Sequence, residues 1–151
     1  MQNIQNLISQ LESKIPFHEK TNLSVSNATV GWQIEHSLKT IYQIVLVVKN
    51  SNPQEYQWKF NKSKLFISIL GFIPRGKAKA PKVVLPDDTI SEESLLLSLQ
   101  KVKSALQEWD SFDKNACFPH PFFGNLNKKS TMWFLKLHTN HHLKIVNDIC
   151  K

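Results

Sequence analysis

Residues 133–150 read WFLKLHTNHHLKIVNDIC, and their apolar and polar side chains recur at the spacing of an amphipathic α-helix. On a helical wheel, four residues lie within about 40° of His138: Phe134, His142, Ile145 and Ile149. The opposite side carries polar residues: Lys129, Lys136, Asn140, Lys144 and Asn147. Asn127 is a good N-cap, so we expect one helix from that residue to about Cys150.

His138 and His142 lie four residues apart on the apolar side of this expected helix. Residues at that spacing share one helix face, about 5–6 Å apart at Cβ, so two imidazoles can bind one metal ion. The alternative interpretation is a pair of core histidines satisfied by ordinary hydrogen bonds. His141 lies about 60° from His138 on the wheel, where it could pair with His138 or lie at the rim of the same face.

Two segments nearer the N-terminus also have helical periodicity. The first has apolar residues at helical spacing and ends at Pro16: Ile4, Leu7, Ile8, Leu11 and Ile15. The second should run from Thr29 or Val30 to about Lys49 and has its own apolar stripe: Ile34, Leu38, Ile41, Val45 and Val48. Its second half is apolar on nearly every side, so we expect this helix at the centre of the fold.

A third helix should follow a long connection over residues 71–88. It should begin at a capping box over residues 89–92, with Ser91 as a competing cap. Its apolar stripe is Leu95, Leu99, Val102, Leu106 and Trp109. Two shorter segments differ from these: residues 64–70 could form helical turns or a short strand, and two prolines prevent residues 118–124 from being helical.

The periodic segments predict an all-α fold, a four-helix bundle with one long connection between the second and third helices. The chain has 151 residues, which is enough for a core, and we expect residues 1–151 to form a single domain. Glycine is scarce, with 4 residues, which argues against an all-β fold and against a glycine-rich phosphate loop.

We expect a cytoplasmic protein that does not span a membrane. The N-terminus lacks the basic flank and apolar core of a signal peptide. The longest apolar run, residues 44–48, is far too short to cross a bilayer. Two cysteines, Cys117 and Cys150, do not make a disulfide framework.

The net charge of +7 raises the question of nucleic-acid binding. The lysines are spread along the chain, and a local basic cluster occurs at Arg75, Lys77, Lys79 and Lys82. That cluster lies in a segment with proline and glycine and has no interleaved aromatic residues, which is typical of a solvated loop. We therefore do not expect nucleic acid as a partner.

A third ligand is needed because two imidazoles hold a metal ion poorly. Three histidines outside the C-terminal helix are candidates: His18, His36 and His120. His36 lies opposite the apolar stripe of its helix, so its face is either solvated or the wall of a wet pocket between helices. His18 follows Pro16 in a loop and should be exposed, whereas His120 lies between two prolines and could line a pocket mouth or pack a turn.

The pattern Trp32-x-x-x-His36-x-Leu38, followed by His138-x-x-x-His142, resembles the DinB-like superfamily of four-helix-bundle proteins. The stretches FPHPFFGNL at 118–126 and HTNHHL at 138–143, with Trp133 between them, resemble an uncharacterised branch of that superfamily. The resemblance spans about residues 29–149. It implies that His36, His138 and His142 bind one divalent metal ion, usually zinc or nickel.

The resemblance also implies what the protein acts on. Characterised relatives include transferases and isomerases that use low-molecular-weight thiols, so a metal-dependent thiol transferase or a hydrolase is expected, with a small molecule as substrate. It further suggests a homodimer. No residue of this sequence marks the thiol or the acceptor.

Catalytic residues other than metal ligands cannot be assigned from the sequence. An HExxH motif, which would place a glutamate base beside two ligands, is absent. Glu35 neighbours His36 but points about 100° away from it on a helix. The lack of an identifiable acid or base supports a second hypothesis, a non-catalytic metal-binding or stress-response module with the same bundle.

Overall fold

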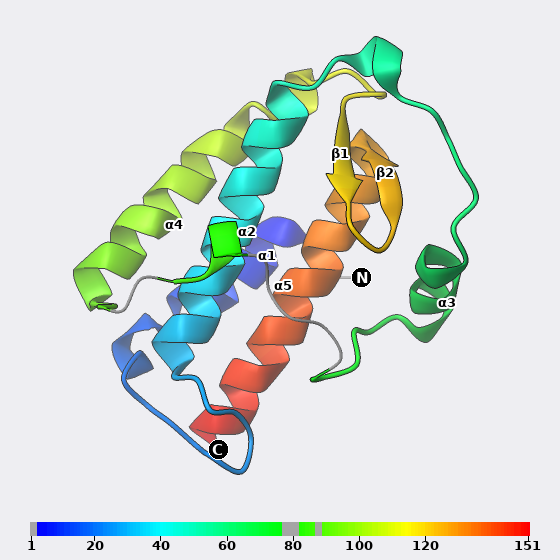
Figure 1. Cartoon of the computed structure of the whole chain (residues 1–151). Coiled ribbons are helices and arrows are strands. Elements are labelled where there is room, and N and C mark those ends of the chain that lie inside the picture. Colours follow the sequence, from blue (N-terminus) through cyan, green and yellow to red (C-terminus); the bar gives the residue numbers. More distant parts are fainter. Residues whose placement is uncertain (1–2, 77–81, 87–88) are drawn as a thin grey trace.

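The structure is a computed structural model that describes residues 3–76, 82–86 and 89–151. These residues form five α-helices and one two-stranded antiparallel sheet (Figure 1). The helices are α1 (Ile4–Glu12), α2 (Val30–Lys49), α3 (Lys62–Leu70), α4 (Glu92–Gln107) and α5 (Lys128–Cys150). The strands are β1 (Cys117–His120) and β2 (Gly124–Asn127).

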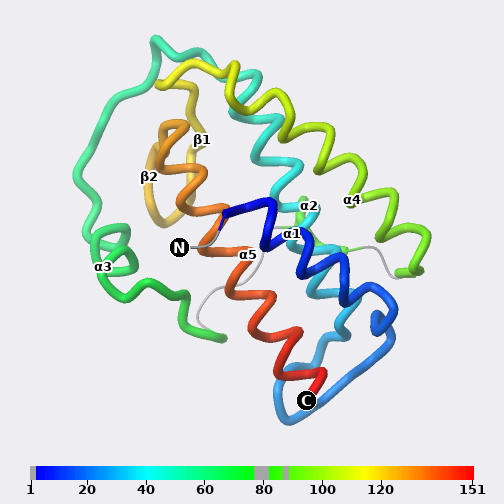
Figure 2. The backbone as a smooth tube through the Cα atoms, turned by 180° about the vertical axis from the view of Figure 1, so that it is seen from behind, coloured from blue at the N-terminus to red at the C-terminus, as the bar shows by residue number. Residues whose placement is uncertain are grey.

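The central helix of the fold is α2, which packs against α4 and α5, while α1 contacts α5 and α4 from the other side (Figure 2). All five residues of the predicted apolar stripe of α2 are buried. Burying one such side chain contributes about 1.5–3 kcal/mol, so this helix is a main source of stability. The prediction that it lies at the centre is confirmed.

The prediction of an all-α four-helix bundle is wrong, because a β-hairpin precedes α5. β1 and β2 are antiparallel, with Cys117 opposite Asn127 and His120 opposite Gly124. Pro119 lacks an N–H, but both strands of a two-stranded sheet are edge strands, in which proline is tolerated. Gly124 has φ +71°, which allows the chain to reverse after the two prolines.

Helix α3 lies within the connection between α2 and α4, where the sequence left helix and strand open. The side chain of Asn61 accepts a hydrogen bond of 2.8 Å from the N–H of Lys64, and Gly71 ends the helix with φ 70°. None of the nine described residues of α3 is buried. The helix stands apart from the others in both views (Figures 1 and 2), tied back where Asn61 donates to the carbonyl of Phe122 and Lys64 to Ser130.

The expected starts of α2 and α5 agree with the structure, whereas α1 ends at Glu12, before Pro16, and α4 ends at Gln107, before Trp109. Thr29 caps α2, and Asn127 caps α5 by accepting a hydrogen bond of 3.0 Å from the N–H of Ser130. Helix α4 begins at the competing cap, because Ser91 and Ser94 form the capping box there.

Two further predictions concern the basic cluster and the absence of a membrane-spanning helix. Lys77 and Lys79 of the predicted basic loop lie outside the described residues. Among the described helices, none is both long and apolar enough to cross a membrane.

Candidate metal centre

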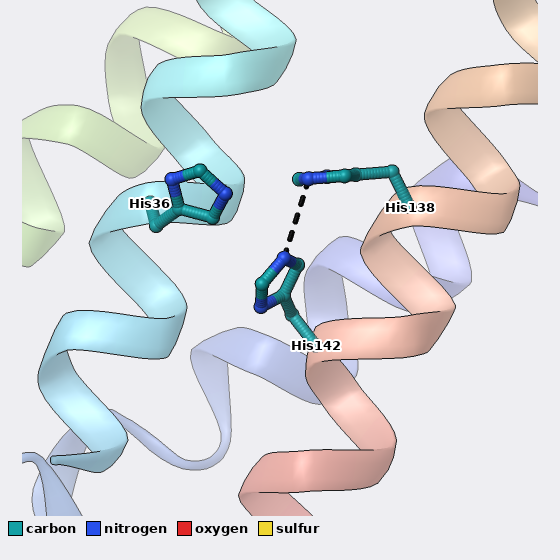
Figure 3. Close-up of side chains that lie close together, drawn as sticks. All are labelled: His36, His138 and His142. Carbon is teal, nitrogen blue, oxygen red and sulfur yellow. Dashed lines mark hydrogen bonds between the residues drawn. The ribbon is translucent and has the colours of Figure 1, made fainter. Parts of the chain in front are cut away.

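Three histidines from two helices converge in the interior of the fold. His36 projects from α2 toward His138 and His142, which project from α5 (Figure 3). One nitrogen of each ring lies within 4.8 Å of the other two. The ring centroids of His36 are 5.1 Å from His138 and 4.6 Å from His142. We refer to these three residues as the histidine cluster.

Two members of the histidine cluster are buried, and His138 is half-buried. His36 is 3% exposed and His142 is 8% exposed. Burial lowers the pKa of both imidazoles, and for His142 the neighbouring histidines lower it further. The pKa of His138 is likewise well below its usual value because of burial and the charges of nearby histidines. The three rings are therefore neutral at pH 7 and keep lone pairs for a metal ion.

The orientation of His36 is fixed from two sides. Its Nδ1 donates a hydrogen bond of 2.9 Å to the main-chain oxygen of Val84, which belongs to a short 3-10 helix at Lys82–Val84. The indole of Trp32 stacks on the ring, with centroids 5.1 Å apart and planes 17° from parallel. Because Nδ1 carries the proton, the lone pair is on Nε2.

His142 is held in the same tautomer by a side chain of α2. Its Nδ1 donates a hydrogen bond of 2.6 Å to Oε1 of Gln33. Nε2 of the same amide donates to Oγ of Ser26 at 3.2 Å. The lone pair of His142 is therefore on Nε2, which lies 3.2 Å from Nε2 of His138.

The histidine cluster fits a divalent metal ion. Two nitrogens bound at 2.0–2.1 Å to a tetrahedral ion are about 3.3 Å apart, close to the 3.2 Å between His138 and His142. The N–H of metal-binding histidines normally donates to a carbonyl or carboxylate, as those of His36 and His142 do here. Nδ1 of His138 is buried without a hydrogen-bond partner among the described residues. The three histidines could hold a metal ion; without one, Nε2 of His138 donates a hydrogen bond to Nε2 of His142 at 3.2 Å.

The remaining histidines lie outside the cluster. His141 is at its rim: its ring is 5.0 Å from that of His142, and it hydrogen-bonds the backbone of Ile73. His18 is half-buried rather than exposed, and Nδ1 of its ring hydrogen-bonds the carbonyl of Ile15 at 3.2 Å.

His120 packs the turn of the hairpin, one of the two roles that the sequence left open. Its Nδ1 accepts hydrogen bonds of 3.1 Å from the N–H groups of Phe122 and Phe123. Its ring stacks on Phe123 at 4.3 Å and meets the edge of Phe134 at 4.4 Å. Burial lowers the pKa of His120 to about 4, so the ring accepts these bonds in its neutral form.

No carboxylate of the described residues joins the histidine cluster within ligand distance. Glu35 is buried, but its Oε1 accepts a hydrogen bond of 3.0 Å from Ser98 of α4. This side chain therefore faces α4, in agreement with the expectation that it points away from His36.

Two residues that support the histidine cluster were not predicted. Gln33 lies three residues before His36 and therefore on the same face of α2. This spacing was the sequence signal that Gln33 could reach the cluster. Val84 contributes only its main-chain oxygen, which any residue type could supply, and no sequence signal identifies it.

The comparisons with known proteins place part of the chain in a family. A family model described as "Protein of unknown function (DUF1569)" matches residues 68–148. The match begins at residue 68, so it includes His138 and His142 but not His36. No curated protein and no solved structure matches the chain.

Proposed function

The chain belongs to the DUF1569 family, whose description assigns no function, and from the histidine cluster we propose that it is a metal-dependent enzyme acting on a small molecule. The observation that carries the proposal is the convergence of His36, His138 and His142, each with one ring nitrogen within 4.8 Å of the other two. The resemblance to the DinB-like superfamily supports the same three ligands. It also supports zinc or nickel as the metal and a homodimer as the assembly.

The residues at the site would have two roles, binding the ion and orienting its ligands. His36, His138 and His142 would hold the ion, while Val84 and Gln33 would keep the proton on the far nitrogen of two of these rings. A divalent ion with three neutral imidazole ligands retains its full charge and an open position, which lowers the pKa of a water or thiol and polarises a carbonyl.

We favour thiol transfer over hydrolysis. Hydrolysis by activated water usually needs a general base beside the ion, and among the described residues no carboxylate lies with the histidine cluster. A thiol at the ion would lose its proton to solvent water, its sulfur would form a bond to an electrophilic carbon, and the leaving group would depart with the electron pair of the broken bond. The substrates would be a low-molecular-weight thiol and an electrophile.

The second candidate function is a metal-binding module without catalysis. The deep burial of His36 and His142 favours it, since a reacting molecule must reach the ion. The same three ligands would then serve stability or metal storage.

The test is the metal content of protein purified without a histidine tag. We expect about one divalent ion per chain, lost in His138→Ala and retained in His141→Ala, the matched variant of a histidine outside the cluster. Wild-type protein without metal, or unchanged binding in His138→Ala, would rule out both functions. Turnover of a thiol with an electrophile then separates them: a metal-loaded protein that turns over no substrate pair is the non-catalytic module.

A further inference from the structure

A groove of about 660 Å³ lies on the side of α5 that faces away from the histidine cluster. Lys129, Met132 and Lys136 of α5 line it, and on a helical wheel they lie about 120–180° from His138. The opposite wall comes from the loop between α4 and β1, where Lys114 and Asn115 line the groove. We refer to it as the lysine groove. It shares no residue with the histidine cluster.

The lysine groove has a strongly positive rim. Four lysines line it: Lys114, Lys128, Lys129 and Lys136. None of the lining residues is acidic. Among the described residues, the salt bridges do not involve any of these lysines. Four ammonium groups around one hollow repel one another, and an anion relieves that repulsion.

One of the four lysines, Lys128, makes hydrogen bonds within the protein. Nζ of Lys128 donates to the carbonyls of Asp110 and Phe112, at 2.9 and 2.7 Å, so it fixes the loop and keeps its charge at the groove. The nearby carboxylate of Asp113 accepts a hydrogen bond of 2.7 Å from the N–H of Asn115 and does not line the groove. Lys129 and Lys114 are exposed and Lys136 is half-buried, so these three can meet a ligand.

The floor of the lysine groove is apolar and aromatic. Trp109 is buried, and its ring packs against Phe112 with centroids 5.6 Å apart. Trp133 is half-buried and packs against Phe123 at 5.9 Å. Met132 completes the floor. A half-buried indole held by neighbours is a ready surface for a flat ring, because it loses little freedom on binding.

We propose that the lysine groove binds an aromatic phosphate, such as a mononucleotide, with the ring against Trp133 and the phosphate among the lysines. A bare phosphate would leave the aromatic floor unused, and an uncharged ring would leave the lysines unpaired. The volume is within the range of small-molecule sites, about 300–1,000 Å³, which favours a small ligand over a nucleic acid strand. The proposal is independent of the metal.

The test uses the indole N–H signals of the four tryptophans in ¹⁵N-labelled, metal-stripped protein, assigned with single Trp→Phe variants. We expect AMP or phenyl phosphate to shift the signals of Trp109 and Trp133 and to leave Trp32 and Trp58 in place. The tighter binder of the two shows whether the groove prefers a nucleotide or a simple aryl phosphate. Adenosine and inorganic phosphate should each bind at least about tenfold more weakly, because each uses half of the groove.

A charge-matched pair of variants locates the anion. Lys129→Ala/Lys136→Ala should raise the Kd about tenfold. Lys59→Ala/Lys101→Ala removes the same charge from exposed lysines outside the groove and should change the Kd less than about twofold. Three results would overturn the proposal: no shift at millimolar ligand, equal weakening in both double variants, or an affinity for oligonucleotides that rises with strand length. None of these results changes the metal content, so failure of this proposal can be told apart from failure of the proposed metal-dependent function.

Discussion

Gln33 of α2 and His142 of α5 are joined by a hydrogen bond of 2.6 Å between Oε1 and Nδ1, although 109 residues separate them in sequence. The bond decides which nitrogen of His142 carries the proton. It also links the two helices that supply the histidine cluster. The amide of Gln33 contacts Ser26 in turn, so the contacts that position His142 begin before α2.

Replacing Gln33 with leucine should weaken metal binding. The volume is similar, but Nδ1 of His142 loses its acceptor, and loss of such a partner typically lowers metal affinity about 10–100-fold. Gln43→Leu makes the same chemical change on α2 away from the cluster and is the control. Titration of the metal-stripped variants with zinc measures the effect. Equal affinities for the two variants would show that the hydrogen bond does not support metal binding.

The sequence predicted the ligand pair on α5 because helical spacing alone places His138 and His142 on one face. For His36 the same reasoning left two possibilities, a solvated face or the wall of a pocket. The choice depends on a partner 48 residues downstream, the carbonyl of Val84, which carries no side-chain signal. Contacts made by the main chain at long range are invisible to residue patterns.

The hairpin and α3 were harder to predict for different reasons. Each strand of the hairpin has four residues, and one contains proline, so neither alternation nor β-propensity could appear. In α3 the apolar run was too short for periodicity to separate helix from strand. The flanking Asn61 and Gly71 were usable signals, because they are an N-cap and a left-handed C-terminal residue.

Shortening the side chain of His120 should destabilise the hairpin. His120→Ala leaves the N–H groups of Phe122 and Phe123 without their acceptor and removes the ring between Phe123 and Phe134, so we expect a loss of at least ~1–2 kcal/mol in unfolding free energy. His120→Asn keeps an acceptor oxygen near the turn and should lose less. Urea denaturation of the metal-stripped proteins compares them. An alanine variant as stable as the asparagine variant would contradict the capping role.

Acid should destabilise the metal-stripped protein. Burial lowers the pKa of His36, His120, His138 and His142 below the 6.5 of an unfolded chain. The unfolded state therefore binds more protons below pH 6.5, and stability that is fully present above this pH is lost as the pH falls. For His120, whose folded pKa is about 4, the loss continues down to that pH.

The slope of that loss gives a direct measurement. Each neutral buried histidine contributes up to about 1.4 kcal/mol per pH unit, less where water reaches the ring. Urea denaturation between pH 7 and pH 4 should show unfolding free energy falling with acid, with a shallower fall in His120→Asn. Asp148 is half-buried, and hydrogen bonds from Lys151 and Arg75 lower its pKa, so it is ionised throughout most of this range and does not produce the effect. A flat profile would show that the histidines take up protons as readily in the folded chain as in the unfolded chain.

The stability of the fold should depend strongly on the buried side chains of α2 and hardly at all on the exposed side chain of Ile69 in α3. Leu38 is 0% exposed, so Leu38→Ala removes packed methyl groups and should reduce the unfolding free energy by about 2–5 kcal/mol. Ile69 is 77% exposed, and Ile69→Ala should change it by less than about 0.5 kcal/mol. The two substitutions delete comparable amounts of hydrocarbon, so burial is the main difference between them. If Ile69→Ala proves as damaging as Leu38→Ala in urea denaturation, then α3 is covered by another surface in solution, and a concentration-dependent midpoint would show that this surface belongs to a second copy of the chain.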